Sequence, residues 1–374
     1  MKIFHAIDSG GFYGAEVMLV NLAAEQIKQG LHPVIVSVGD PGIEDKPLEV
    51  EARKRGLPVK VVRMRPGLNY KGARQLLRYC HAENFDLIHS HGYKCNVLLG
   101  PLPGFVRKKP MLSTVHGWTS TTGLTKMRVY EWLDALSLRF VDVVVLVNKG
   151  MLQNPKIARL SSKKMFVVDN GIPVAPPDTS SFEPLDPRLV EFCQDDFVAG
   201  SIGRYSVEKG FDILLKSFSL LLDEISNARL ILIGEGGQRA QYENIIAENN
   251  LTDKVMLTGY CPDAWRYLDL MDVYVISSLT EGLPITLLEA MRSKIPVVST
   301  RVGGIPDVLR DGRGGVLVPP GKIKELSQAL IAQYRAPDKT TARTEYSFER
   351  FNANYSSRKM CEAYTDIYET MLSK

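Results

Sequence analysis

The stretch Asp272-Val-Tyr-Val-Ile-Ser277, followed by Glu281-Gly-Leu-Pro-Ile-Thr-Leu-Leu-Glu289, decides how this chain folds. The first part is an apolar run typical of a strand, and the second begins a helix, with Pro284 suited to its first turn. The loop between them is an anion site, because free N–H groups and the positive end of the helix dipole face outward there. Carboxylates beside such a site suit a ligand with both phosphate and hydroxyl groups, such as a nucleotide sugar. The alternative is that Glu281 only favours the helix dipole and Glu289 is a solvated helix residue.

The composition is that of an ordinary globular protein large enough for two domains. Of the 374 residues, 45% are hydrophobic and 24% are charged. The five cysteines form no C-x-x-C pair, which favours reduced thiols in a cytosolic protein. Asp8 ends the first apolar run before a signal-peptide core, and no run approaches the ~18 residues of a membrane span. We expect a cytoplasmic protein, with peripheral attachment to the inner face of the cytoplasmic membrane as a further option.

Positive charge is concentrated in the first half of the chain. Residues 1–170 hold 24 Lys and Arg against 14 Asp and Glu, a net +10, whereas the remainder holds 22 against 28, a net −6. A basic half indicates an anionic partner: a phospholipid surface, a phosphorylated acceptor or nucleic acid. Basic and aromatic residues do not interleave, which argues against nucleic acid.

One basic stripe favours an anionic membrane surface as the partner. A solvated face on an ordinary helix is the alternative. The stripe consists of Lys71, Arg74, Arg78 and His81 beside the apolar Leu76, Leu77 and Cys80, with Arg107, Lys108 and Lys109 adding to it.

Apolar β-branched runs alternate with helical patterns, as in parallel α/β folds. The proline-rich residues 173–187 read as a linker between a domain at 1–172 and a domain at 188–354. We therefore expect two doubly wound Rossmann-like domains facing each other across a cleft, with ligands bound at the carboxyl ends of the strands. The expected strands are 3–7, 33–38, 59–62, 87–89, 111–115, 143–147 and 166–168 in the first half, and 197–202, 230–233, 255–257, 273–276, 297–299 and 316–318 in the second.

Other loops at expected strand ends also carry suitable residues, because glycine lets backbone N–H groups approach a phosphate closely. Arg204 and Lys209, in one such loop, could both reach a diphosphate; a solvated pair beside a helix cap is the alternative. No Asp-x-Asp pair and no His/Cys cluster has metal-ligand spacing, so we expect neither a metal nor a cofactor. The loops are Gly10–Gly14, His116–Trp118, Gly203–Gly210, Gly234–Gly237 and Arg301–Gly304.

Together these residues resemble the retaining GT-B glycosyltransferases of family 4, also called group 1. The similarity runs from Gly10 to about Gly321 and is densest at 203–210, 234–237 and 272–321. The resemblance implies transfer of a sugar, with retention, from a nucleotide-diphosphate sugar to a hydroxyl acceptor. UDP is the expected nucleotide, and a cell-envelope glycan or lipid-linked saccharide is the expected acceptor.

The resemblance also implies residue roles. Arg204 and Lys209 would clamp the diphosphate, while Glu281 would position the transferred sugar. Further donor-binding residues would be Glu289 at the ribose, the backbone of Leu283, Ile285 and Thr286 at the phosphate, and the loops containing Gly10, Gly11, Gly234 and Gly236. His116 would touch the sugar near its anomeric centre, and His91 and Tyr93 lie where acceptor contacts are expected.

The resemblance extends weakly to the end of the chain. Residues 348–374 read as helix, and a C-terminal helix at about 355–374 is expected to pack back onto the first domain. Lys294 stands where the family usually has Gly, and Ser277-Ser278 replaces the usual Pro-Ser.

Three other functions stay open. A GT-B sugar-nucleotide epimerase would share the fold. A nicotinamide-dependent oxidoreductase would explain the Gly10–Gly14 loop but would leave Arg204, Lys209 and the two glutamates without a role. A non-catalytic nucleotide-sugar-binding protein could keep the diphosphate clamp without turnover.

Overall fold

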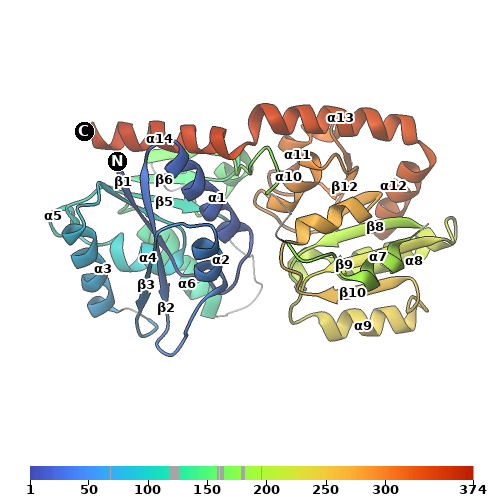
Figure 1. The fold of residues 1–374 in the computed structure, drawn as a ribbon, viewed down its shortest axis with the longest axis horizontal. Helices are drawn as coiled ribbons and strands as arrows, with labels where there is room; N and C mark the ends of the chain where they lie inside the picture. The colour runs from blue at the N-terminus through green and yellow to red at the C-terminus, as the bar shows by residue number, and fades with distance from the viewer. Residues whose placement is uncertain are drawn as a thin grey trace. The chain divides into compact units, whose positions relative to one another are not determined.

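The computed structural model describes residues 1–67, 69–117, 126–157, 160, 164–177, 182–194 and 196–373. The chain divides into two compact units: Met1–Pro173 with Tyr355–Lys374 (unit 1), and Val174–Asn354 (unit 2). Each unit has one sheet of parallel strands covered by helices (Figure 1). The predicted fold class of two Rossmann-like α/β domains is therefore confirmed. Part of the proline-rich segment, residues 178–181, lies outside the described residues.

Unit 1 contains a seven-stranded sheet in the order β3-β2-β1-β4-β5-β6-β7. Its direction of winding reverses between β1 and β4, where the connections after two adjacent strands leave towards opposite faces of the sheet and make room for a ligand. The strands are β1 (Lys2–Ile7), β2 (His32–Gly39), β3 (Val59–Arg63), β4 (Leu87–Ser90), β5 (Met111–Val115), β6 (Val143–Leu146) and β7 (Met165–Val167). The helices are α1 (Gly14–Lys28), α2 (Pro47–Lys54), α3 (Tyr70–Ala82), α4 (Tyr93–Leu99), α5 (Gly104–Arg107), α6 (Lys126–Ser137), the 3-10 helix η1 (Lys149–Gln153) and α14 (Ser357–Leu372).

The strands of unit 1 place alternate side chains on opposite faces of the sheet. Phe4 and Ala6 of β1 join the core beneath α3 and α4, whereas Ile7 packs with α1 and α2. The apolar stripe of α3 faces this core, with Leu76, Leu77 and Cys80 among its buried residues. These three residues are therefore not available to a membrane, contrary to the surface suggested by the sequence.

Unit 2 contains a six-stranded sheet in the order β10-β9-β8-β11-β12-β13, with its reversal between β8 and β11. All thirteen expected strands of the chain are present, with ends that differ by at most two residues. The strands are β8 (Phe197–Ile202), β9 (Ala228–Ile233), β10 (Val255–Gly259), β11 (Val273–Ile276), β12 (Val297–Thr300) and β13 (Val316–Val318). The helices are α7 (Pro187–Cys193), α8 (Phe211–Leu222), α9 (Arg239–Glu248), α10 (Ile285–Arg292), α11 (Ile305–Val308), α12 (Ile323–Arg335) and α13 (Pro337–Asn354), with 3-10 turns η3 (Val207–Lys209), η4 (Ala264–Leu270) and η5 (Arg310–Gly312).

The end of the chain is two helices rather than one continuous helix from residue 348. Helix α13 stops at Asn354, and α14 starts after Ser356, whose hydroxyl accepts a hydrogen bond from the Lys359 N–H. The peptide N–H of Ser357 donates to the Ile172 carbonyl at 2.8 Å. The helix breaks here because Ser356 caps a new helix and the neighbouring backbone pairs with unit 1.

Lys294 ends α10 in a left-handed conformation, with φ of 56°. Glycine is the usual residue there because a Cβ atom is strained in this conformation. The Lys294 ammonium is 2.9 Å from Glu345 and lies over the Phe348 ring, both on α13. These contacts offset part of the strain, which explains how the chain tolerates Lys where the family usually has Gly.

Buried histidines connect α14 to the sheet of unit 1. His5 and His89 are register partners on β1 and β4, so both rings lie on one face. The Tyr368 hydroxyl is 2.6 Å from Nδ1 of His89 and 3.4 Å from Nε2 of Gln26 on α1. Figure 1 shows α14 running beside α1. Polar groups therefore specify how this C-terminal helix docks, in addition to its apolar contacts.

We expect acid to destabilise this histidine cluster. Burial lowers the pKa of His5 to about 4, and burial and neighbouring rings lower the pKa of His89 and His91 well below the ordinary value. Because an unfolded histidine titrates near ~6.5, the unfolded chain binds more protons as the pH falls below that value. The stabilisation of the folded state by these neutral buried rings is complete above pH ~6.5, and it is lost as the pH falls towards ~4. For each ring that stays neutral in the folded state, the free energy of unfolding should fall by about 2 kcal/mol as the pH is lowered from ~6.5 to ~5.

Urea unfolding at pH 7, 6 and 5 measures this loss. The decrease of the unfolding free energy with falling pH should be unchanged in His32→Asn, because His32 is exposed. It should be smaller in His5→Asn, which lacks one of the buried rings. An unfolding free energy that is constant between pH 7 and pH 5 would contradict a neutral buried cluster.

Candidate functional site

Glycine-containing loops pack closely against one another at the reversal point of the unit 2 sheet. Gly210 has φ of 61°, and a Cβ there would collide with the Ser277 carbonyl after β11. Gly303 has φ of 56°, and a Cβ there would collide with the Glu281 carbonyl. The Gly304 N–H donates to the Gly282 carbonyl at 2.8 Å. The loops after β8, β11 and β12 thus support one another through backbone contacts.

An ion pair joins the loops that follow β8 and β11. Nζ of Lys209 is 2.7 Å from Oε1 of Glu281, and the Ser278 hydroxyl donates to the same oxygen at 2.6 Å. The Lys209 and Glu281 side chains are 24% and 11% exposed. The Ser277 hydroxyl donates to the Lys209 carbonyl at 2.9 Å. Two residues predicted to bind the donor are therefore in direct contact, and both remain accessible to a ligand.

Arg204 lies in the same loop as Lys209. Its guanidinium is 2.6 Å from the Glu208 carboxylate, and its side chain is half exposed. Burial would raise the pKa of Glu208, but hydrogen bonds from its own backbone, Ser206 and Arg204 lower it below the ordinary value. Glu208 is thus ionised at neutral pH and holds Arg204 at the rim of the site.

Helix α10 presents its amino end at this same edge of the sheet. It begins at Ile285, with Pro284 as the N-cap rather than in the first turn as the sequence suggested. The first N–H groups of a helix have no acceptor within it. Leu283 and Ile285 are buried, while Thr286 and Glu289 are half-buried. The predicted phosphate-binding backbone therefore lies at a helix start, which attracts anions.

Tyr274 of β11 lies beneath both predicted carboxylates. Burial raises its pKa, and the nearby charges of Glu289 and Glu281 raise it further, against a hydrogen bond with Thr286. The Tyr274 hydroxyl donates to the Ile202 carbonyl at 3.4 Å. Tyr274 is therefore a neutral buried support for this site, a role that the sequence pattern did not reveal.

The Gly234–Gly237 loop after β9 is also held close to β8. The Tyr205 N–H donates to the Glu235 carbonyl at 2.7 Å, and a Cβ on Gly236 would collide with the Tyr205 carbonyl. A Cβ on Gly234 would likewise collide with the Gly203 carbonyl. The loops after β8, β9, β11 and β12 therefore form one continuous rim.

In unit 1 the Gly10–Gly11 loop follows β1, at the reversal point of that sheet. Asp8, which precedes the loop, pairs with Lys46 at 2.8 Å and with Lys94 at 3.1 Å. Lys94 also reaches Asp40 at 3.3 Å. Neither lysine carries a signal in the sequence, because its partners are far away in the chain and no local motif connects them.

His116 and His91 lie on neighbouring strand ends of unit 1. Nε2 of His116 is 3.4 Å from Nδ1 of His91, and Nε2 of His91 is 3.0 Å from Nδ1 of His5. His91 is buried, with both ring nitrogens used by other histidines, whereas His116 is half-buried. The Tyr93 hydroxyl donates to the Gly117 carbonyl at 3.3 Å. His91 thus lies behind His116, and Tyr93 braces the loop that carries it. Trp118 is outside the described residues.

One group of three potential metal ligands occurs within the described parts of the chain: His5, His89 and His91. Each of the six ring nitrogens is already within hydrogen-bonding distance of a protein atom, the partners being Gln26, Thr114, Tyr368, His116 and the rings of the group itself. The rings of His89 and His91 also contact each other, with centroids 3.9 Å apart and ring planes tilted by 31°. This arrangement fits a hydrogen-bonded polar core better than a metal site.

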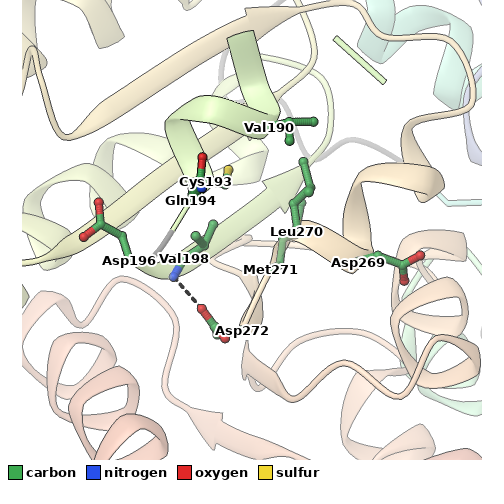
Figure 2. A pocket seen from close by; sticks show the side chains of 9 residues that line it. All are labelled: Val190, Cys193, Gln194, Asp196, Val198, Asp269, Leu270, Met271 and Asp272. Atoms are coloured by element: carbon green, nitrogen blue, oxygen red, sulfur yellow. Dashed lines mark hydrogen bonds between the residues drawn. The ribbon is translucent and has the colours of Figure 1, made fainter. Parts of the chain in front are cut away.

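A pocket of about 310 Å³ lies near the amino ends of β8 and β11, away from the glycine loops. Figure 2 shows Asp272 bonded to the Val198 N–H at its floor, at 2.7 Å. Cys193, Asp196 and Asp269 also line it. None of the predicted site residues contributes to this pocket, and the carboxyl ends of the strands remain the candidate site.

Known proteins with similar sequences are glycosyltransferases. The chain is 22% identical over 316 residues to the capsular polysaccharide biosynthesis glycosyltransferase CapM of Staphylococcus aureus, covering 81% of this chain and 82% of that protein. It is 23% identical over 274 residues to the UDP-Gal:alpha-D-GlcNAc-diphosphoundecaprenol alpha-1,3-galactosyltransferase of Escherichia coli, covering 70% and 69%.

The fold is also that of a solved structure. Anabaena Alr3699/HepE, crystallised in complex with UDP-glucose, superposes with a TM-score of 0.83 at 20% identity, covering 99% of this chain and 100% of that one. Residues 12–175 match the family model Glycosyltransferase Family 4, and residues 187–350 match Glycosyl transferases group 1. The second match covers the glycine loops of unit 2, and the first begins at residue 12, directly after Gly10 and Gly11. The chain belongs to the family 4 glycosyltransferases with the GT-B fold.

Proposed function

We propose that this enzyme transfers a sugar, with retention of anomeric configuration, from a UDP-sugar to a hydroxyl of a glycan or lipid-linked saccharide. The contact between Lys209 and Glu281 supports the proposal, because a cation that could bind a diphosphate lies beside a carboxylate that could accept from sugar hydroxyls. The Alr3699/HepE complex with UDP-glucose supports the choice of UDP. The lipid-linked acceptor in the name of the E. coli relative and the capsular polysaccharide in that of CapM support the acceptor class.

The donor diphosphate would bind between Arg204, Lys209 and the amino end of α10. As the bond from the sugar to the diphosphate breaks, negative charge grows on the departing phosphate. Positive groups already aimed at that position stabilise the charge without reorganising. Two cationic side chains and the α10 dipole supply this charge in unit 2, so we propose that no divalent metal is required. Unchanged turnover in EDTA tests that part of the proposal.

Glu281 would change partners when the donor binds. Its Oε1 accepts from Lys209 and Ser278. A diphosphate that attracts Lys209 would leave this oxygen free to accept from sugar hydroxyls. Glu281 therefore positions the sugar, and the acceptor hydroxyl attacks from the face that the diphosphate leaves. The anomeric configuration of the product, read by NMR, tests retention.

Glu289 would bind the ribose hydroxyls. The glycine loop with Gly234 and Gly236 would line the donor site and contact the donor. The carboxyl edge of the unit 1 sheet, with Gly10, Gly11, His116 and Tyr93, would bind substrate groups from that unit. Gly10 has open space where a Cβ would stand, so its backbone remains accessible.

A basic surface on unit 1 would bring the enzyme to an anionic membrane that carries the acceptor. Lys71, Arg74 and Arg78 are exposed on α3, and the His81 ring is 2.9 Å from the Arg107 carbonyl of α5. Figure 1 shows α3 and α5 near one another. On α5, Phe105 is 80% exposed and Val106 is also exposed. None of the helices in the described parts of the chain is long and apolar enough to span a bilayer. These exposed side chains would supply the apolar contact that the buried face of α3 cannot.

Glu281→Gln should lower kcat by about 10²-fold while UDP binding survives, because it removes a charged acceptor that acts on the sugar and not on the nucleotide. Steady-state transfer from UDP-sugars and UDP titration measure the two quantities. Glu243→Gln, on the exposed face of α9, is the matched control and should leave both unchanged. Full turnover in Glu281→Gln would contradict the proposed role.

Vesicle sedimentation tests the membrane surface. The wild-type protein should pellet with vesicles of phosphatidylglycerol and phosphatidylcholine and stay in the supernatant with phosphatidylcholine alone. Phe105→Asp should lose binding, because it places a charge where an apolar ring meets the lipid. Leu372→Asp, at an exposed position on α14, should retain it. Equal recovery in the supernatant with both vesicle types would contradict the surface.

A further inference from the structure

A continuous line of hydrogen-bonding side chains leads from α14 through the interior of unit 1 to His116. It begins at Tyr368 and passes to Gln26, whose Oε1 is 2.8 Å from Nε2 of His5. It continues from Nδ1 of His5 to Nε2 of His91 at 3.0 Å, and from Nδ1 of His91 to Nε2 of His116 at 3.4 Å. His5, His91 and Gln26 are buried, so water cannot replace these contacts.

We propose that Gln26, His5 and His91 form a one-way hydrogen-bond chain that fixes which ring nitrogen of His116 carries the proton, so that His116 offers a bare Nδ1 to the substrate. Each neutral imidazole has one N–H donor and one acceptor nitrogen. The position of the proton on one ring therefore determines its position on the next ring.

The direction follows from the Gln26 amide. Its oxygen faces His5, so Nε2 of His5 must donate and Nδ1 of His5 must accept. Nε2 of His91 then donates to His5, Nδ1 of His91 accepts, and Nε2 of His116 must donate to it. Nδ1 of His116 is left unprotonated, and it has no hydrogen-bonding partner within the described parts of the chain.

The opposite side of the amide is consistent with this direction. Nε2 of Gln26 donates to the Tyr368 oxygen, and the Tyr368 hydroxyl donates to Nδ1 of His89 at 2.6 Å. Nε2 of His89 then donates to the Thr114 hydroxyl at 2.8 Å. The Thr114 hydroxyl in turn lies 2.9 Å from the Tyr364 hydroxyl. Reversing the Gln26 amide would reverse every step and make Nδ1 of His116 a donor, so the orientation of this amide sets the direction.

The rings of His5, His91 and His116 must all be neutral for the hydrogen bonds to run in one direction. Burial lowers the pKa of His5 and of His116 to about 4, and burial with neighbouring rings lowers that of His91 well below its ordinary value. At pH 7 each ring therefore carries a single proton, whose position the neighbours decide. A bare Nδ1 accepts a hydrogen bond from a sugar hydroxyl, which suits the role proposed for His116; this functional part rests on the proposed function.

Two-bond ¹H–¹⁵N correlation spectra of the full chain test the arrangement without substrate, since they distinguish a protonated from a bare ring nitrogen. His5, His91 and His116 should each carry the proton on Nε2. A proton on Nδ1 of His116, or a doubly protonated ring at pH 7, would overturn the proposal. Because the spectra need no donor or acceptor, the result stands apart from whether the chain transfers sugars.

Gln26→Met tests the consequence for activity, because it keeps the length of the side chain and removes the amide that sets the direction. We expect a mixture of His116 tautomers and a loss of about tenfold in kcat, the scale of one hydrogen bond, with the donor KM retained. Gln29→Met, exposed at the end of the same helix, should change neither quantity. An unchanged His116 tautomer in folded Gln26→Met would overturn the proposal.

Discussion

The ion pair between Lys209 and Glu281 is the contact on which the proposed chemistry of unit 2 depends. These residues are 72 positions apart, and they meet because β8 and β11 are parallel neighbours whose carboxyl ends share one edge of the sheet. Glycines at 210 and 303 allow the supporting loops to approach within backbone contact. A Cβ at position 210 would collide with the Ser277 carbonyl, and one at position 303 with the Glu281 carbonyl. The glycine loops thus serve the geometry of charged groups, as well as leaving backbone N–H groups open to a phosphate.

Unit 1 uses a different device to organise its strand ends. Buried neutral histidines, an amide and tyrosine hydroxyls connect β1, β4 and α14 through directed hydrogen bonds. Such a network is costly if any member is left unsatisfied and specific when all are paired. It makes the end of the chain part of the support for His116, although α14 contributes no predicted ligand contact. The charged set around Asp8 gives the Gly10–Gly11 loop a second, ionic support.

The strands and their order of appearance could be predicted from the sequence because buried parallel strands are nearly continuous apolar runs. The residues proposed for the donor site stand in loops after such runs, and two of them, Lys209 and Glu281, are in contact. Local patterns carry no trace of contacts such as Lys46 with Asp8 or Gln26 with His5, which depend on three-dimensional packing. The division at Ser356 was missed because the apolar spacing of residues 348–374 continues through it. For α3 the sequence left open both a membrane surface and an ordinary solvated helix, because helical periodicity alone cannot tell a core from a bilayer.

A thermal-shift titration with UDP, GDP, ADP and NAD⁺ tests the diphosphate site that we propose at the reversal point of unit 2. Ligand at ~100 times its Kd stabilises the folded state by about 2.7 kcal/mol, which should raise Tm by several degrees. We expect a rise with UDP that is abolished in Arg204→Ala and retained in Arg335→Ala, at an exposed position on α12. A rise with NAD⁺ alone, or an undiminished UDP response in Arg204→Ala, would contradict it.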